Sequence, residues 1–184
     1  MKIIFYKTLL TKEKDLTPTE RIIYSFLVSK SITLISELFD SDGTCLNVIE
    51  LYSLVDDDNW IDLYHINNTQ ISQILNIARK TVTRSIEKLK SLGYIQGDYI
   101  HVTKEILENG YFELQRLDIL TGELVIFYSY IKHKSLFFGG CIDTYKTKLA
   151  ECLATTKVAI TKLLNRLYAL NLAKRLSDGK LMIL

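Results

Sequence analysis

Basic and hydroxyl side chains are concentrated in one short stretch of the chain, between residues 79 and 88. Apolar residues alternate with them at helical spacing, which predicts an amphipathic helix with an inner and an outer face. Lysine and arginine on the outer face can contact phosphates, and arginine and threonine can reach base edges in a groove. The outer face consists of Arg79, Lys80, Thr81, Thr83, Arg84 and Lys88.

A second stretch near the C-terminus carries a similar set of side chains. On its predicted helix, Val158 stands where the first stretch has Lys80. Leu163 stands where the first stretch has Ser85, so we expect more apolar surface on this helix. Two interpretations stay open: DNA contact with fewer basic anchors, or a helix that binds a protein partner. The candidate contact residues are Thr155, Lys157, Thr161, Lys162 and Arg166 on the helix, and Lys174, Arg175 and Lys180 on the following hairpin.

Both stretches belong to a larger unit that occurs twice in the chain. Residues 71–95 align without a gap on residues 149–173, and residues 16–31 align without a gap on residues 120–135. The order of the two segments is the same in both units, which indicates an internal duplication. In the 16–31 segment, the identical pairs are Leu16/Leu120, Thr17/Thr121, Ile22/Ile126, Tyr24/Tyr128, Ser25/Ser129, Lys30/Lys134 and Ser31/Ser135.

The aligned segments predict a helix, a tight turn, a second helix and a β-hairpin in each unit. In the first unit, Asn76 and Ile77 form the predicted turn between the helices, and Gly97-Asp98 forms the turn of the hairpin. Helix, turn, helix and hairpin together make a winged helix. The inner face of the second helix is predicted to consist of Val82, Ile86, Leu89 and Leu92.

Capping residues mark where these helices begin. Thr17 and Glu20 form a capping-box pattern before the first long helix, and Thr121 is the matching cap in the second unit. Ala78 stands at the cap position of the first outer-face helix, which predicts a start weaker by about 1 kcal/mol. Thr156 supplies the missing cap in the second unit.

The remaining segments connect these helices. Each unit opens with an extended aromatic segment, at residues 3–8 and 111–115, and a short capped helix at residues 103–109 links the units. The first unit has the longer connection between its first helix and its helix pair. That connection predicts a helix at residues 47–54 and a strand within residues 60–66.

The predicted fold class is mainly α with small β-hairpins, arranged as two tandem winged helix-turn-helix domains. Residues 1–109 form the first domain, with an acidic insert at about residues 32–68, and residues 110–184 form the second. We expect a separate core in each domain. We also expect the acids to lie away from the basic helices, because negative charge beside phosphate opposes binding. The acids are Glu37, Asp40, Asp42, Glu50, Asp56, Asp57, Asp58 and Asp62.

Composition narrows the classes of protein further. The chain has 184 residues, 48% of them hydrophobic, and a formal net charge of +2, so the total charge predicts no partner. We find no secretory signal and no apolar run of membrane length, which predicts a cytoplasmic protein without a membrane partner. The three cysteines have no CxxC spacing, and the three histidines have no ligand spacing. We therefore expect no catalytic residues, no metal, no cofactor and no enzyme activity.

The order of these segments resembles that of a known class of proteins. FYKTLL, then LTPTERIIYSFL, then a strand-bearing insert, then ISQILNIARKTVTRSIEKLKSLGYI is similar to the N-terminal part of plasmid and phage replication initiators with tandem winged helices. The helix pair also resembles the winged helix-turn-helix regions of bacterial regulators. The likeness covers most of the chain, and its specific part is ARKTVTRSIEKLKSLGYI. The resemblance implies that the residues facing the groove are Arg79, Lys80, Thr81, Thr83 and Arg84.

Together, the residue pattern and the resemblance predict sequence-specific binding of double-stranded DNA. The protein would act as a replication initiator of a mobile element or as a transcription regulator. The alternative is a protein-interaction module that uses winged helices without reading DNA. A homodimer, and a replication or transcription protein as partner, stay open.

Overall fold

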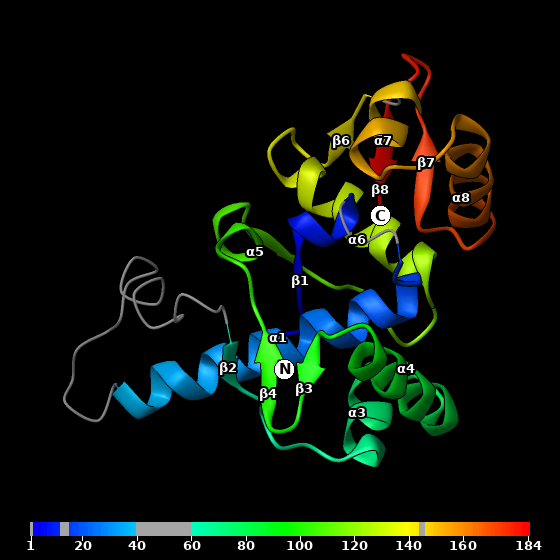
Figure 1. Ribbon diagram of the computed structural model, residues 1–184. Helices are drawn as coiled ribbons and strands as arrows, with labels where there is room; N and C mark the ends of the chain where they lie inside the picture. The colour runs from blue at the N-terminus through cyan, green and yellow to red at the C-terminus, as the bar shows by residue number, and fades with distance from the viewer. Residues whose placement is uncertain (1, 12–14, 40–59, 144–145) are drawn as a thin grey trace.

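The computed structural model describes residues 2–11, 15–39, 60–143 and 146–184 (Figure 1). Its helices are the 3-10 helix η1 (Lys7–Leu10), α1 (Pro18–Phe39), α3 (Asn68–Leu75), α4 (Arg79–Ser91), α5 (Lys104–Glu108), α6 (Glu123–Leu136), α7 (Lys146–Cys152) and α8 (Lys157–Ala169). Its strands are β1 (Ile4–Tyr6), β2 (Trp60–Asp62), β3 (Ile95–Gln96), β4 (Tyr99–His101), β5 (Tyr111–Glu113), β6 (Cys141–Ile142), β7 (Ala173–Arg175) and β8 (Leu181–Ile183). The predicted helix at residues 47–54 and all acids of the insert except Glu37 and Asp62 lie outside the described residues.

The strands form three small antiparallel sheets, so the molecule is mixed α and β. One sheet has the order β2-β4-β3, another has the matching order β6-β8-β7, and β1 pairs with β5. In the β3–β4 hairpin, Gln96 pairs with Tyr99, which leaves Gly97 and Asp98 as the predicted two-residue turn. Gly97 has a φ of +59°, a conformation that favours glycine at this first turn position. Each hairpin therefore belongs to a three-stranded sheet, which the sequence pattern did not indicate for the second unit.

Capping residues explain where several of the helices begin. The backbone N–H of Thr17 donates to Glu20 Oε2 at 2.7 Å, and the backbone N–H of Glu20 donates to Thr17 Oγ1 at 3.4 Å, which confirms the predicted capping box. The predicted cap at Thr121 is wrong. Gly122 occupies the N-cap of α6 with a φ of +56°, a conformation open to glycine, and no side chain caps this helix. The short helix α5 is capped by Thr103 as predicted.

The short helices of both helix pairs also follow the local sequence. Asn76 ends α3 in the left-handed conformation, as expected of a tight turn, and Ala154 takes the same conformation at the matching position. Ala78 at the N-cap of α4 provides no side-chain hydrogen bond, as predicted. At the N-cap of α8, Thr156 Oγ1 accepts from the backbone N–H of Ala159 at 3.1 Å, so the predicted cap is confirmed.

The β1–β5 pair joins the two halves of the chain. Phe5 lies opposite Phe112 in this ladder, and their ring centroids are 5.3 Å apart. Backbone hydrogen bonds extend the ladder at both ends, from Lys7 to Gly110 at 3.0 Å and from Leu114 to Ile3 at 2.8 Å. The first extended segment ends at Tyr6, earlier than predicted, because η1 begins at the next residue.

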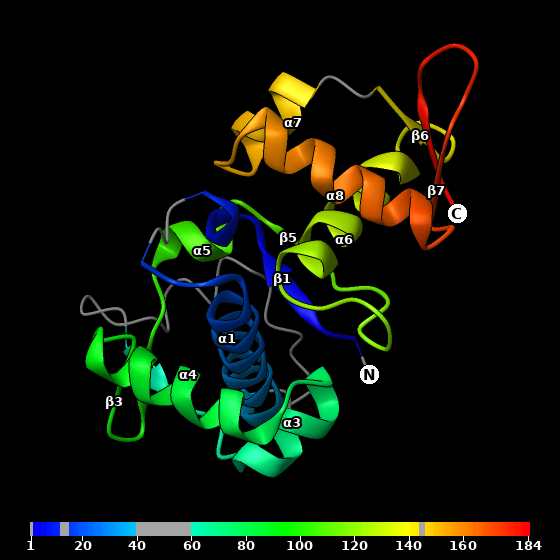
Figure 2. The same ribbon diagram turned by 90° about the vertical axis from the view of Figure 1, so that its right-hand side faces the viewer.

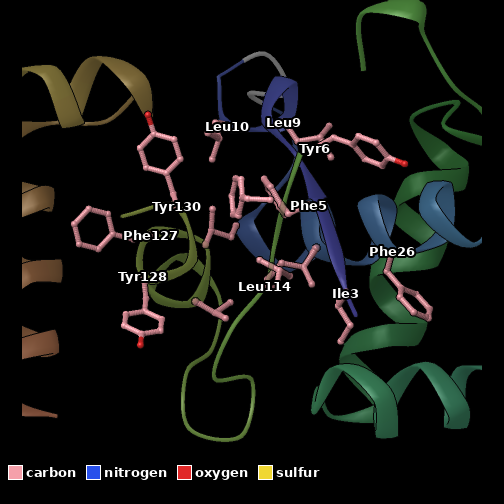
Figure 3. Packing of buried hydrophobic residues seen from close by; sticks show 14 of the residues in the cluster. Ile3, Phe5, Tyr6, Leu9, Leu10, Phe26, Leu114, Phe127, Tyr128 and Tyr130 are labelled. Carbon is pink, nitrogen blue, oxygen red and sulfur yellow. The ribbon is translucent and has the colours of Figure 1, made fainter. Parts of the chain in front are cut away.

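The buried apolar residues form one continuous cluster that spans both halves, so the prediction of two separate cores is wrong. The reason is the β1–β5 pair, because α1 packs against β1, α6 packs against β5, and the two helices also contact each other. Figure 3 shows Phe5 and Leu114 between α6, which carries Phe127, and α1, which carries Phe26. None of the described helices is both long enough and apolar enough to cross a membrane.

The identical tyrosines of the 16–31 and 120–135 segments occupy matching positions in the two halves. The hydroxyl of Tyr24 on α1 donates to the carbonyl of His101 in β4. The hydroxyl of Tyr128 on α6 donates to the carbonyl of Leu184, directly after β8, at 2.9 Å. Each tyrosine is fully buried and connects the long helix of its half to the last strand of its hairpin. The repeated tyrosine therefore serves packing between a helix and a sheet.

The identical serines attach the same two helices to the central strand pair. Ser25 Oγ accepts from the backbone N–H of Tyr6 at 3.0 Å and donates to the carbonyl of Ile4 at 3.0 Å. Ser129 Oγ accepts from the backbone N–H of Gln115 at 2.8 Å. Both serines are buried, and each satisfies a backbone N–H that is buried at Tyr6 and partly buried at Gln115.

Candidate nucleic-acid interface

The helix α4 has one buried face and one exposed basic face. Val82, Ser85 and Leu89 are buried against the core. An α-helix turns by about 100° per residue, which puts Lys80 and Arg84 nearly opposite this buried face. Both side chains are exposed, and Arg79 is exposed at the edge of the same face. Leu92 was expected to point inward but is 43% exposed, because the helix ends at Ser91.

The threonines of α4 differ in their surroundings. Thr83 Oγ1 donates to the carbonyl of Arg79 at 3.1 Å and accepts from Asn68 Nδ2 at 3.0 Å. The second bond connects the start of α3 to the middle of α4, so Thr83 also fixes the angle between the two helices. Thr81 is exposed in the first turn of α4.

Lys88 makes an intramolecular contact that its sequence position did not indicate. Its Nζ lies 3.1 Å from Glu20 Oε2 and donates to the carbonyl of Asp15 at 3.0 Å. Burial acts to raise the pKa of Glu20, but hydrogen bonds from Thr17 and Lys88 outweigh it, so the pKa is below its ordinary value of 4.5. Lys88 therefore stabilises the start of α1, and its ammonium group is directed away from the centre of the exposed face.

The helix α8 presents the matching face of the second half. Lys157, Lys162 and Arg166 are exposed on it, and Thr161 Oγ1 donates to the carbonyl of Lys157 at 2.9 Å. Val158 is 65% exposed at the position that Lys80 occupies in the first half.

The apolar surface expected at Leu163 is absent. This side chain is only 5% exposed, because its position on the helix, like that of Ser85, faces the core. Thr155 lies half-buried in the turn before α8, where its backbone N–H donates to the carbonyl of Ala150.

The two hairpins differ in charge. Lys174 and Arg175 are exposed on β7, and Lys180 is exposed just before β8. Asp178, in the same turn, lies 3.6 Å from Lys180 Nζ and partly offsets its charge. The β3–β4 hairpin has no Lys or Arg and carries Asp98 at its turn. Only the second hairpin is therefore suited to contact phosphates.

The helices α4 and α8 lie on a common side of the molecule. In Figure 1 both are on the right, and in Figure 2, which turns this side toward the viewer, α8 lies above α4. In Figure 2, α4 runs from α3 on the right to β3 on the left, whereas α8 runs from α7 on the left to β7 on the right. The two helices therefore run in opposite directions across this side. Binding of a single duplex by both helices requires such a common side. The other condition, that the acids of the insert lie away from this side, concerns residues that are mostly outside the described part of the chain.

Two positioning features were missed in the sequence. Asn67 and Gln70 form a full capping box at the start of α3, with Asn67 Oδ1 accepting at 2.9 Å and Gln70 Oε1 accepting at 3.2 Å. Their Asn-x-x-Gln spacing is a local signal that could have predicted it. Asn76, in the turn between α3 and α4, donates to the carbonyl of Leu117 in the other half at 2.9 Å. No local pattern indicates that second contact.

Among the described residues, no group of three or more His, Cys, Asp or Glu side chains is placed to hold a metal ion. Cys141 and Cys152 are free thiols, and Cys45 lies outside the described residues.

Comparison with known proteins finds a similarity in the first helix pair. Residues 64–96 match the family model described as winged helix-turn-helix DNA-binding. The matched stretch begins after β2 and covers α3, α4 and the first strand of the hairpin. Neither a curated protein nor a solved structure matches the chain. The first helix pair is thus similar to winged helix-turn-helix DNA-binding domains, and this similarity supports DNA binding as a general function.

Proposed function

We propose that the protein binds double-stranded DNA in a sequence-specific manner, with α4 and α8 as the recognition helices. The observation that carries this proposal is the presence of two exposed basic helices on one side of the molecule (Figure 2). An α-helix fits the major groove, where arginine can form paired hydrogen bonds with guanine. In this reading Arg79, Lys80, Thr81, Thr83 and Arg84 contact one groove segment, and Thr155, Lys157, Thr161, Lys162 and Arg166 contact another.

The hairpin of the second half completes the proposed interface. Lys174, Arg175 and Lys180 would contact the phosphate backbone next to α8, and such contacts position a protein without reading sequence. Lys88 is a weaker member of the set than the sequence suggested, because its ammonium group already pairs with Glu20. We also propose that residues 1–109 and 110–184 act as two winged-helix units, although they share one core.

A salt titration with short duplexes tests DNA binding. Fluorescence anisotropy would measure the affinity for a random duplex of about three helical turns at several salt concentrations. The logarithm of the binding constant should fall linearly with the logarithm of salt concentration, by about 0.9 per phosphate contacted. Replacing Lys174, Arg175 and Lys180 by alanine should reduce this slope by two to three units. The matched control is Lys104→Ala, an exposed lysine on α5, which lies left of the middle in Figure 1, away from α4 and α8 on the right.

The outcome separates DNA binding from its alternative. A protein-interaction module without DNA reading would show no salt-dependent affinity for any duplex, and that result would overturn the proposal. Footprinting on the DNA that flanks the gene would then distinguish two roles. Several protected repeats beside an origin indicate a replication initiator, and a single protected site at a promoter indicates a transcription regulator.

A further inference from the structure

A cavity of about 480 Å³ opens in the second half of the molecule, between α6, β6 and α7. Its walls are mainly apolar, formed by Tyr130, Phe138, Ile142 and Leu149. Phe138 is 68% exposed although it is a large aromatic side chain, whereas Ile142 and Leu149 are buried. An apolar group seated in the cavity would cover the Phe138 ring and remove it from water.

The charged residues around the cavity are mostly basic. Lys134, Lys148 and Lys180 line it, against Asp143 as the one acid among its lining residues. Asp178, which does not line the cavity, pairs with Lys180 at 3.6 Å and partly offsets its charge. The ammonium of Lys134 lies 5.7 Å from the centre of the Tyr130 ring, which holds this charge beside the apolar wall. Apolar walls with an excess of positive charge favour a ligand that combines an apolar body with a negative group.

Tyr130 gives the cavity a polar contact on its inner side. Figure 3 shows its side chain extending from α6 toward α7. Burial raises the pKa of the Tyr130 phenol, and a hydrogen bond with Cys152 on α7 raises it further, so the phenol stays neutral at physiological pH. A neutral phenol does not repel an anion.

The matching positions of the first half have different chemistry. Phe26 stands at the position that matches Tyr130, and Ile74 stands at the position that matches Cys152. The first half therefore has apolar side chains at both positions. Phe26 is 1% exposed and belongs to the continuous core. The contact between Tyr130 and Cys152 is therefore a property of the second half, whereas Lys134 has an identical counterpart in Lys30.

We propose that this cavity binds a small amphipathic organic anion, with an aromatic or aliphatic body and one carboxylate, sulfonate or phosphate group. The apolar body contacts Phe138 and Leu149, and the negative group lies near Lys134 and Lys148. Occupancy also affects DNA binding, a consequence that rests on the proposed function. Leu149 lies on α7, the helix paired with α8, and Lys180 belongs to the basic hairpin. An anion held in the cavity therefore adds negative charge beside this hairpin and lowers the affinity for DNA.

A matched pair of probes tests the binding site without DNA. The anionic probe is 8-anilinonaphthalene-1-sulfonate, and the neutral one is N-phenyl-1-naphthylamine, which has the same rings without the sulfonate. Fluorescence and calorimetric titrations should show one site per chain and a preference of about fivefold or more for the anion. The Lys134→Ala/Lys148→Ala variant should lose that preference, and the Lys104→Ala control should keep it.

Two further variants locate the probe. Cys152→Phe puts a bulky ring at the cavity wall and should weaken binding of both probes, while Phe137→Ser removes the exposed aromatic residue next to Phe138 and should leave binding unchanged. Circular dichroism melting confirms that each variant folds. Equal binding of the two probes to the wild type, or binding lost in Phe137→Ser and kept in Cys152→Phe, would overturn the site.

The effect on DNA is measured separately. At a probe concentration that just saturates the wild type, 8-anilinonaphthalene-1-sulfonate should weaken duplex binding of the wild type by a factor of about three or more and should weaken that of the Lys134→Ala/Lys148→Ala variant less. If the probe binds and duplex affinity does not change, the regulatory consequence is overturned while the site stands. If the protein binds no duplex under any condition, the proposed function fails, and the probe titrations still decide whether the anion site exists.

Discussion

In the first half of the molecule α4 exposes Arg79, Lys80 and Arg84, whereas in the second half α8 exposes Lys157 and Lys162 with Val158 between them. The scaffold beneath the two helices is alike, since a buried tyrosine and a buried serine make corresponding hydrogen bonds in each half. Arginine forms paired hydrogen bonds with base edges and phosphates, and lysine provides a single charge. We infer that duplication kept the packing residues while the exposed faces diverged, and that α4 is the better suited to read bases.

The ends of the two helices diverge in the same way. Lys88 near the end of α4 pairs with Glu20, while the matching residue of α8, Arg166, is exposed. Leu124 stands at the matching position of Glu20 and is buried, so the second half offers no carboxylate there. A basic residue at the same repeat position thus stabilises α1 in one half and faces solvent in the other. Charge in the aligned sequence does not by itself identify a DNA contact.

The strongest test of this comparison replaces the basic pair of each recognition helix. Arg79→Ala/Arg84→Ala should weaken binding to a preferred duplex by about 10- to 100-fold, because a base contact is worth roughly 1 to 3 kcal/mol. Lys157→Ala/Lys162→Ala should have a smaller effect, similar on preferred and random duplexes. Anisotropy titrations on both duplexes measure the difference. Unchanged affinity and salt slope in the folded Arg79/Arg84 variant would exclude α4 as the reading helix.

The shared scaffold can be tested by removing the two matched serine hydroxyls. Ser25→Ala and Ser129→Ala should each lower the free energy of unfolding by about 1 to 3 kcal/mol, because each leaves a buried or partly buried backbone N–H without its acceptor. Ser25→Ala should have the larger effect, since its hydroxyl also donates to Ile4. Urea denaturation gives the values, with the exposed Ser177→Ala as control. If either variant is as stable as the control, the serine on that side does not stabilise the scaffold.

The N-cap residues of α4 and α8 differ between the halves, and substitutions can exchange their chemistry. Thr156→Ala should destabilise the protein by about 1 kcal/mol, and Ala78→Ser should stabilise it by a similar or smaller amount, because Ser and Thr accept from backbone N–H groups at an N-cap. Thermal and urea unfolding of both variants measure the two changes. Changes of the same sign would show that the two N-caps are not equivalent.

The smallest effects are expected at Lys88 and Arg166. Lys88→Ala should lower the free energy of unfolding by less than about 1 kcal/mol near neutral pH, because the pair is partly exposed to solvent. Glu20 has a lowered pKa in the folded protein, so its pairing stabilises above pH 4.5, its ordinary value, and is lost as the pH falls through the lowered value. The difference between Lys88→Ala and the wild type should therefore vanish in acid.

Arg166→Ala is the counterpart of that experiment. It should leave stability unchanged at every pH and reduce the salt slope of DNA binding by about one unit. Anisotropy titrations and urea unfolding at several pH values check both variants. A loss of DNA affinity in Lys88→Ala equal to that in Arg166→Ala would show that Lys88 leaves Glu20 to contact DNA.

Local features of this protein could be predicted because they depend on residues close together in the chain. The capping box of α1 requires Thr17 and Glu20, and the cap of α8 requires Thr156. The first hairpin turn requires Gly97 and Asp98, which lie between paired strands. The cap predicted at Thr121 was wrong because Gly122, in a backbone conformation with positive φ, occupies the N-cap of α6. The duplication itself was also visible, since buried tyrosines and serines recur at fixed spacing.

Contacts between distant residues were decided only by the tertiary structure. Strand β1 pairs with a strand more than 100 residues away, and that pairing merges the two expected cores into one. The same packing places α4 and α8 on one side of the molecule and brings Lys88 to Glu20 (Figure 2). Periodicity and capping act within a few residues and determine how each helix begins and which face is apolar. The partner of that apolar face depends on the whole chain, and so does the difference between a lysine that can contact DNA and one that stabilises a neighbouring helix.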